Sequence, residues 1–340
     1  MAGVRALIVN HDGERLLGAC LEALLACLAR HPGPARAVVV DNASSDRSVE
    51  LVRRRFPAVE VVERAVNDGF GAGVNAGLAG GDEEWALLVN SDMTLAPTAL
   101  ERLLAAAAVD PRVGAAGAQI RFAADPDVIN SAGVSVDVLG VAADRLAGLP
   151  LEAGGGPPRE VFGVSAGAAL YRRAMLADIG GFDEAFFLYL EDVDVAWRAR
   201  ARGWRALYVP DAVAWHRHSA TARHGSPAKH FHVGRNRVRL LARNATAAQL
   251  RRHGPRMVAH DLLHCAYVAA TARTAAPLRG RVAGLREWRA ERRAADPAPV
   301  ALDPAAGLRA ALARNSAWRR YSDSASAATA ANAAAPRSTA

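Results

Sequence analysis

The chain has 340 residues, of which 51% are hydrophobic and 22% charged, and its formal net charge is +8. That length suggests two structural units, and no run of about 18 consecutive apolar residues indicates a membrane-spanning helix. The N-terminus leads straight into Val4–Asn10 without a basic or long apolar leader, so we expect no signal peptide. Cys20 and Cys27 lie at helical spacing, which favours core packing over a metal knuckle and indicates a reduced, cytoplasmic protein. A basic chain can bind nucleic acid, an anionic membrane or phosphorylated substrates, and charge alone does not choose among them.

The first half of the chain alternates short apolar runs with amphipathic segments. We expect strands at Ala6–Val9, Ala37–Asp41, Val59–Val62 and Trp85–Val89, and helices at Leu16–Leu28, Ser48–Phe56 and Pro97–Val109. Pro97 is expected at the first position of its helix. Apolar strands that alternate with helices predict an α/β fold, with a mainly parallel sheet and helices on both faces.

Polar residues collect where the expected strands end, at Asn10–Asp12, Asp41–Asp46 and Asn90–Asp92. In parallel α/β sheets, ligands bind beyond the carboxyl ends of the strands. The sequence therefore predicts a binding site at this edge of the sheet.

The second half changes character near residue 226. From about 228 to 295 the pattern is basic and helical without strand signals, and the tail consists mostly of Ala, Ser, Thr and Asn. We place an α/β domain at 1–225, a basic, mainly helical region at 226–321 and a disordered tail at 322–340.

Three polar segments each admit a structural and a functional interpretation. Asp41–Asp46 is either a turn that caps a helix or a set of groups that binds a nucleobase or ribose. The glycine-rich stretch Asp68–Gly77 imitates a dinucleotide fingerprint but follows the third strand, so we interpret it as a loop that lets backbone approach a phosphate or sugar. Asp92 and His216 are ordinary structural residues when taken singly, whereas together they offer ligands for a hard cation on a diphosphate.

Three carboxylates crowd into four residues at Glu191, Asp192 and Asp194, at the start of a helix that ends before Gly203. The helix dipole favours anions in a first turn and accounts for one or two of them. A first-turn aspartate that stays ionised beside an aromatic run is also suited to act as a general base toward a sugar hydroxyl.

Taken in order, several strings resemble glycosyltransferase family 2, the inverting GT-A enzymes, and especially its rhamnosyltransferase-like branch. The strings are Val40–Asp46, Asn67–Gly77, Val89–Asp92, Ser165–Arg173, Gly180–Glu184, Glu191–Arg198 and His230–Arg237. The combination spans roughly residues 4–240 and is specific, although no single string is. The resemblance implies a GT-A (Rossmann-like) fold followed by a C-terminal helical extension.

The resemblance also implies roles for particular residues. On the nucleotide-sugar side these are Asn10, Asp41, Asn42, Asp68, Gly69, Asn75, Asn90, Ser91 and Asp92, and on the acceptor side Ala166, Gly167, Glu191, Asp194 and Trp197. Glu191 and Asp194 would either orient the acceptor or support the start of the helix, where Asp194 can pair with Arg198 four residues on. Asp192 would be the catalytic base, and Asp92 with His216 would hold a divalent cation, Mg²⁺ or Mn²⁺. Asn90 stands where the family's Asp-x-Asp-like motif has its first aspartate, so the expected metal site lacks one carboxylate.

We therefore predict an inverting glycosyltransferase that moves a sugar from a nucleoside-diphosphate sugar to a hydroxyl of a cell-envelope glycan or lipid-linked acceptor. The family resemblance suggests dTDP-rhamnose as the donor. One alternative is a nucleotidyltransferase, which usually needs a lysine on the phosphates, whereas Lys229 is the only lysine and comes late. The other is a non-catalytic sugar-nucleotide-binding module, against which Asp92 and Asp192 both argue.

The arginines between Arg235 and Arg293 leave two interpretations open. They form either a solvated helix face or a peripheral anchor for an anionic membrane, at the inner face of the cell membrane. No motif of interleaved aromatic and basic residues indicates nucleic-acid binding.

Overall fold

The computed structural model describes residues 2–217 and 226–305. The chain begins with β1 (Val4–Asn10), α1 (Glu14–Leu28), β2 (Ala35–Asp41), α2 (Ser48–Arg55), β3 (Glu60–Glu63), α3 (Phe70–Ala79), β4 (Trp85–Val89), β5 (Met93–Leu95), α4 (Ala99–Ala107) and β6 (Val113–Phe122). It continues with β7 (Ile129–Ser131), β8 (Val134–Val136), β9 (Ala142–Asp144), β10 (Arg159–Val161), β11 (Ala168–Arg172), α5 (Arg173–Ile179), α6 (Glu191–Ala201) and β12 (Arg205–His216). Two short 3₁₀ turns lie at Leu151–Gly154 and Glu184–Phe186. Each strand and helix expected in the first half is present. Helix α4 begins at Ala99 with Thr98 as its N-cap, so Pro97 lies before the helix and not at its first position as predicted.

The strands form one large sheet in the order β10-β12-β6-β11-β4-β1-β2-β3, with β5 beside β12 and β7 beside β6. Strand β1 runs parallel to β2 and β4, β2 runs parallel to β3, and β6 runs parallel to β12. Because β11 is antiparallel to both β4 and β6, the two parallel groups point in the same direction. The sheet is mainly parallel, which confirms the predicted α/β class.

Helices cover both faces of the sheet. Side chains alternate along β1, so Ile8 joins the core under α1, α2 and α4, where Leu21 packs, while Leu7 joins the opposite core. That second core lies under α3, α5 and α6 and includes Val74 and Val195. The layered packing fixes the carboxyl ends of the strands, where the predicted polar segments lie.

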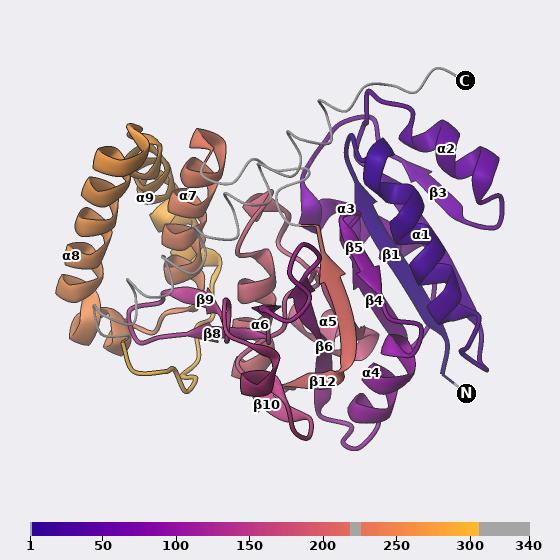
Figure 1. Ribbon diagram of the computed structural model, residues 1–340. Coiled ribbons are helices and arrows are strands. Elements are labelled where there is room, and N and C mark those ends of the chain that lie inside the picture. The colour runs from indigo at the N-terminus through magenta and orange to yellow at the C-terminus, as the bar shows by residue number, and fades with distance from the viewer. Residues whose placement is uncertain (1, 218–225, 306–340) are drawn as a thin grey trace.

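The C-terminal part is helical, with α7 (Pro227–Asn244), α8 (Ala247–Ala272) and α9 (Ala276–Ala294) gathered at the side of the sheet away from α1 and α2 (Figure 1). Helices α7 and α9 approach so closely that a Cβ at Gly280 would lie 2.1 Å from the carbonyl oxygen of Phe231. The predicted helical extension is therefore confirmed over the described residues, and the expected tail at 322–340 lies outside them. Within 2–217 and 226–305, no helix is both long and apolar enough to cross a membrane.

Candidate active site

The ends of β1 and β2 bring two buried polar side chains together. Asn10 pairs in register with Asp41, and its Nδ2 donates to Asp41 Oδ1 at 3.0 Å. Asp41 also accepts hydrogen bonds from the backbone amide and the hydroxyl of Ser44, at 2.9 and 2.6 Å. The predicted turn is therefore present, and the same carboxylate stands at the strand end where a nucleoside would bind.

Two amide oxygens at this edge have no hydrogen-bond partner among the described residues. They are Oδ1 of Asn10 and Oδ1 of Asn42, and both are buried. Asn42 uses its Nδ2 to donate to the carbonyl oxygen of Gly69 at 2.9 Å. Because an unpaired buried acceptor is costly, these oxygens mark positions where a ligand donor, such as a nucleobase N–H, would be favourable.

The glycine-rich loop lies against the segment that leads into α6. Gly69 has a φ of +92°, and a Cβ there would lie 2.2 Å from the carbonyl oxygen of Phe187. The backbone amide of Phe70 donates to that same oxygen at 2.7 Å. Glycine is therefore required at this approach, which joins the predicted donor side to the carboxylate helix.

Asp68 and Asn75 have partners of their own in the chain. Asp68, half exposed, forms an ion pair with Arg64 at 2.8 Å. Asn75 Nδ2 donates to the carbonyl oxygen of Phe182 and to Glu184, both at 2.9 Å. The Asn75 amide thus links α3 to the 182–184 segment, and its contact with a nucleotide sugar, like that of Asp68, stays a prediction.

The turn after β4 places Asp92 beside His216, which ends β12. Asp92 Oδ2 lies 3.2 Å from His216 Nε2, and His216 Nδ1 lies 3.0 Å from Asn130 Oδ1. When two ligand atoms each lie about 2.1 Å from one ion and the angle between them at the ion is roughly 90°, the two ligand atoms are about 3 Å from each other. Asn130 would hold the ring so that Nε2 faces the ion, as partners of metal-bound histidines commonly do. The pair fits a divalent cation.

Among the described residues, no group of three or more His, Cys, Asp or Glu side chains could hold a metal ion. Asn90 contributes an amide where a second carboxylate would be needed, and Ser91 beside it is buried. A cation at Asp92 and His216 would therefore take its remaining ligands from the substrate diphosphate and water.

Backbone at residues 166–167 connects the Asp92 turn to Asp192. The amide of Asn90 donates to the carbonyl oxygen of Gly167 at 2.9 Å, and the amide of Ala166 donates to Asp192 Oδ2 at 3.3 Å. A Cβ at Gly167 would lie 2.7 Å from the terminal methyl group of Met93, which would have to shift to make room. The turn that carries Asp92 and the predicted base Asp192 are thus joined through the backbone of two consecutive residues, Ala166 and Gly167.

The loop that precedes α6 is strained and is held by α7. Phe187, Tyr189 and Leu190 have φ values of 63°, 73° and 68°, a region that costs residues with a side chain about 1–2 kcal/mol each. Buried Asn236 donates from Nδ2 to the carbonyl oxygens of residues 186, 188 and 189, at 2.7–2.8 Å. Helix α7 therefore fixes the loop that positions Asp192.

The neighbouring carboxyls Glu191 and Asp192 at the start of α6 have different pKa values. Burial raises the pKa of Asp192 to about 6, against hydrogen bonds from the amides of Ala166 and Val193, with the charge of Asp144 adding to the rise. Burial and the charge of Asp192 raise the pKa of Glu191 to about 8. Of the two carboxyls, Asp192 therefore loses its proton at the lower pH, and it is the one suited to accept a proton from a substrate.

These pKa values predict how the rate depends on pH. A general base works only when ionised, so the rate should rise as pH increases through about 6 and level off near neutrality. Initial rates of nucleoside-diphosphate release, measured from pH 5 to 8 at saturating substrates, give this profile. A rate that is flat or falls with pH across that window would contradict base catalysis by Asp192.

Asp194 and Trp197 both lie in the core rather than at the surface of the site. Asp194 is fully buried, pairs with Arg198 at 2.6 Å and accepts from Asn244 on α7 at 2.8 Å. Trp197 is 1% exposed and packs edge-on against Phe162, with ring centroids 5.8 Å apart. The helical repeat turns both residues away from Asp192, so Asp194 takes the second of its two expected roles, and we correct the assignment of Trp197 from an acceptor contact to a structural residue.

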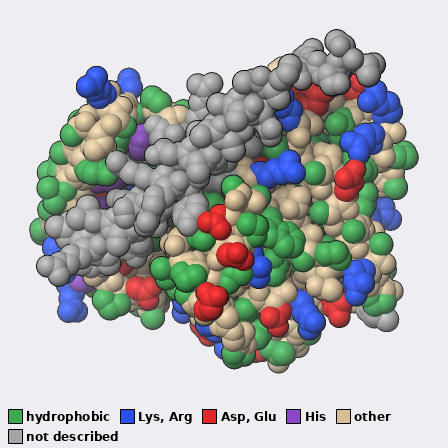
Figure 2. Space-filling view, viewed as in Figure 1, with side chains coloured by type: hydrophobic (Ala, Val, Ile, Leu, Met, Phe, Trp, Pro, Cys, Tyr) green, Lys and Arg blue, Asp and Glu red, His purple; other side chains and the backbone are tan. Residues whose placement is uncertain are grey.

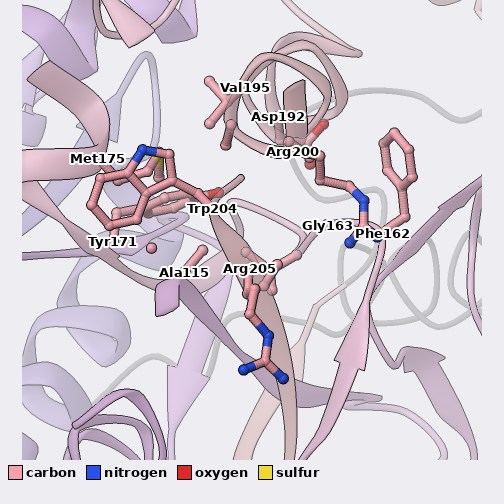
Figure 3. Close-up of a pocket in the computed structure, with 15 residues that line it drawn as sticks. Ala115, Phe162, Gly163, Tyr171, Met175, Asp192, Val195, Arg200, Trp204 and Arg205 are labelled. Carbon is pink, nitrogen blue, oxygen red and sulfur yellow. The ribbon is translucent and has the colours of Figure 1, made fainter. Parts of the chain in front are cut away.

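A small cavity of about 10 Å³ lies behind Asp192, lined by Tyr171, Met175 and Trp204 among others (Figure 3). That volume holds about one water molecule. It is far too small for a sugar nucleotide, so we place the substrate on the other side of Asp192, toward Asp92.

Sequence reasoning missed four residues around this site: Asp144, Tyr189, Lys229 and Asn236. Asn236 lies within, and Tyr189 beside, strings that carry the family resemblance, but neither residue was given a role of its own. Asp144 has no local sequence pattern that indicates a role. Lys229 is distinctive in the sequence, because it is the only lysine of the chain.

Comparisons with known proteins define the class. The profile described as glycosyltransferase like family 2 matches residues 2–239. The chain therefore belongs to glycosyltransferase family 2, and it is a glycosyltransferase rather than a nucleotidyltransferase or a non-catalytic binding module.

Two relatives refine this placement. N-acetylglucosaminyl-diphospho-decaprenol L-rhamnosyltransferase of Mycobacterium tuberculosis is 34% identical over 245 residues, covering 63% of this chain and 76% of that protein. An O-antigen biosynthesis protein of Myxococcus xanthus is 30% identical over 151 residues, covering 41% of this chain and 11% of that protein. The first relative is consistent with the rhamnosyltransferase-like branch.

Solved structures support the GT-A fold. GalNAc-T7 with UDP, GalNAc and Mn²⁺ matches with a TM-score of 0.58 and 13% identity, covering 86% of this chain and 55% of that one. The mannosyltransferase PcManGT of Pyrobaculum calidifontis, with GDP-Man and Mn²⁺, matches with a TM-score of 0.50 and 20% identity, covering 95% and 86%. At these identities the likeness concerns the fold alone.

Proposed function

We propose that this glycosyltransferase transfers a sugar with inversion, using Asp192 as general base and dTDP-rhamnose as donor. The observation that carries the proposal is the junction at Ala166 and Gly167, whose backbone is hydrogen-bonded both to Asp192, a carboxyl with a raised pKa, and to the turn that carries Asp92. This arrangement suits a single displacement, in which the base and the leaving group stand on opposite sides of the sugar.

In the proposed reaction, Asp192 takes the proton of an acceptor hydroxyl, whose oxygen forms a bond to the anomeric carbon. The bond from that carbon to the diphosphate breaks in the same step, and the electron pair leaves with the nucleoside diphosphate. When bound at Asp92 and His216, a divalent cation neutralises the charge of that leaving group. Asn10, Asp41 and Asn42 would bind the nucleoside, and Glu191 would orient the acceptor.

The acceptor is proposed from the rhamnosyltransferase relative, whose name specifies N-acetylglucosaminyl-diphospho-decaprenol. We propose the same class for this chain, a lipid-linked sugar diphosphate used for a cell-envelope glycan. This choice also explains why a membrane-facing surface would be useful.

Incubation with a panel of nucleotide sugars, with Mg²⁺ or Mn²⁺ and with GlcNAc-diphospho-polyprenol, tests the function. We expect dTDP release from dTDP-rhamnose that depends on the acceptor. Transfer from a different nucleotide sugar would correct the donor, and no transfer or hydrolysis of any donor would overturn the proposed function.

Helices α8 and α9 expose an unusual share of apolar side chains. Seven of the ten large hydrophobic residues exposed on the described chain lie there: Val258, Leu262, Leu263, Tyr267, Leu278, Val282 and Leu285. Exposed arginines are interspersed with them, including Arg251, Arg252 and Arg256. Figure 2 shows hydrophobic and basic side chains together at this end of the molecule. Such a mixture fits the surface of an anionic bilayer.

We therefore expect the protein to sediment with vesicles containing anionic lipid, to stay in solution with neutral vesicles, and to be released by high salt. Leu262→Ser with Leu263→Ser should weaken sedimentation, because both side chains are exposed and apolar. Val109→Ser, at an equally exposed valine beyond α4, is the matched control and should have no effect. If equal amounts of protein stay in solution with both vesicle types, membrane binding is rejected and the α8–α9 surface is a solvated helix face.

A further inference from the structure

Lys229 is the only lysine among the 42 Lys and Arg residues of the chain. It lies in the first turn of α7, where its amide donates to the hydroxyl of the N-cap residue Ser226 at 3.2 Å. Its ammonium group lies 5.3 Å from the ring centroid of Tyr189. Tyr189 belongs to the strained loop directly before α6, so α7 brings this lysine beside the loop that positions Asp192.

Asp144, at the end of β9, connects Lys229 to the reacting groups. Burial raises the pKa of Asp144, while a hydrogen bond from Ser131 and the charges of Lys229 and His216 oppose the rise. The charge of Asp144 in turn contributes to the raised pKa of Asp192. Asp144 therefore lies close enough to interact electrostatically with His216, Asp192 and Lys229.

Several carboxyl groups gather at the site before any substrate arrives. Asp92, Asp144 and Asp192 are among them, and a sugar-diphosphate substrate adds phosphate charges. Burial lowers the pKa of Lys229, because an ammonium group out of water is costly unless it faces anions. A cation held in this position is favourable when a phosphate group binds beside it.

We propose that Lys229 is a substrate-binding residue that contacts a diphosphate, either that of the donor or that of the lipid-linked acceptor. The inference rests on the proposed function for the identity of these substrates. The Tyr189 ring and Asp144 would hold the ammonium group in place, and its hydrogen bonds would go to phosphate oxygens.

The first arm of the test compares dTDP with dTMP, by calorimetry with Mg²⁺, for the wild type and Lys229→Met. Methionine keeps the length and the apolar stem but removes the charge. If Lys229 contacts the donor, the affinity for dTDP should fall about ten- to a hundredfold while that for dTMP stays unchanged. Unchanged dTMP binding also shows that the variant is folded.

The second arm measures the KM for GlcNAc-diphospho-polyprenol. If Lys229 contacts the acceptor, this KM should rise at least tenfold while the affinity for dTDP is retained. Arg102→Met, which removes an exposed cation from α4, far from the α8–α9 surface, is the matched control and should change neither quantity.

If Lys229→Met changes neither dTDP affinity nor acceptor KM, the proposal is overturned, whatever the donor. If the wild type itself fails to bind dTDP, the proposed donor fails instead. The comparison is then made with UDP and UMP, and Lys229 is judged on the same difference between diphosphate and monophosphate.

Discussion

Asp192→Asn should lower the rate of sugar transfer by about 10²–10⁴-fold, because asparagine cannot accept the acceptor proton. Asparagine keeps the size of the side chain, and its single amide oxygen can still accept one of the two hydrogen bonds that the amides of Ala166 and Val193 donate to Asp192. The affinity for dTDP should change less than about twofold, since other residues are expected to hold the nucleotide. Steady-state transfer rates and calorimetry with dTDP measure the two quantities.

Asp194→Asn is the matched control on the same helix. It removes a charge from the buried pair with Arg198, so we expect a loss of stability on the order of 3 kcal/mol. The rate per folded molecule should stay near that of the wild type, because Asp194 faces α7 rather than the site. A near wild-type rate for Asp192→Asn would remove Asp192 as the base.

Asp92→Ala should abolish the dependence of dTDP binding on divalent cation, with a loss of at least about tenfold in affinity when Mg²⁺ is present. His216→Ala should have a similar effect, and the double variant should lose little more, because both side chains serve one ion. Calorimetry with and without chelator provides the measurement, and Asp82→Ala, at an exposed aspartate between α3 and β4, is the control. If Asp92→Ala binds dTDP as tightly as the wild type under both conditions, Asp92 is not a cation ligand.

Local patterns predicted the sheet and the edge that carries the site. The apolar run at Trp85–Val89 has the bounds of β4, and the polar residues after β1, β2 and β4 share one edge because these strands are parallel. The helix start at Glu191 was also predictable, since its acidic first turn and Gly203 mark both ends.

Helical spacing predicted that Asp194 can pair with Arg198 four residues on, and this ion pair is present. The complete burial of Asp194 and the hydrogen bond that it accepts from Asn244 depend on the packing of α6 against α7, which the spacing does not reveal. Asn236 and Asp144 lie about 45 residues to either side of Asp192, so their roles depend on tertiary contacts. Positive φ angles at Phe187 and Tyr189 are likewise imposed by those contacts rather than by residue type.

The anomeric configuration of the product tests the central claim most directly. Direct displacement with Asp192 as base requires the new glycosidic bond to have the configuration opposite to that of the donor, because the acceptor oxygen attacks from the side opposite the diphosphate. NMR of the product formed from dTDP-rhamnose and GlcNAc-diphospho-polyprenol reads this configuration. We predict complete inversion, and a product that retains the donor configuration would contradict the account.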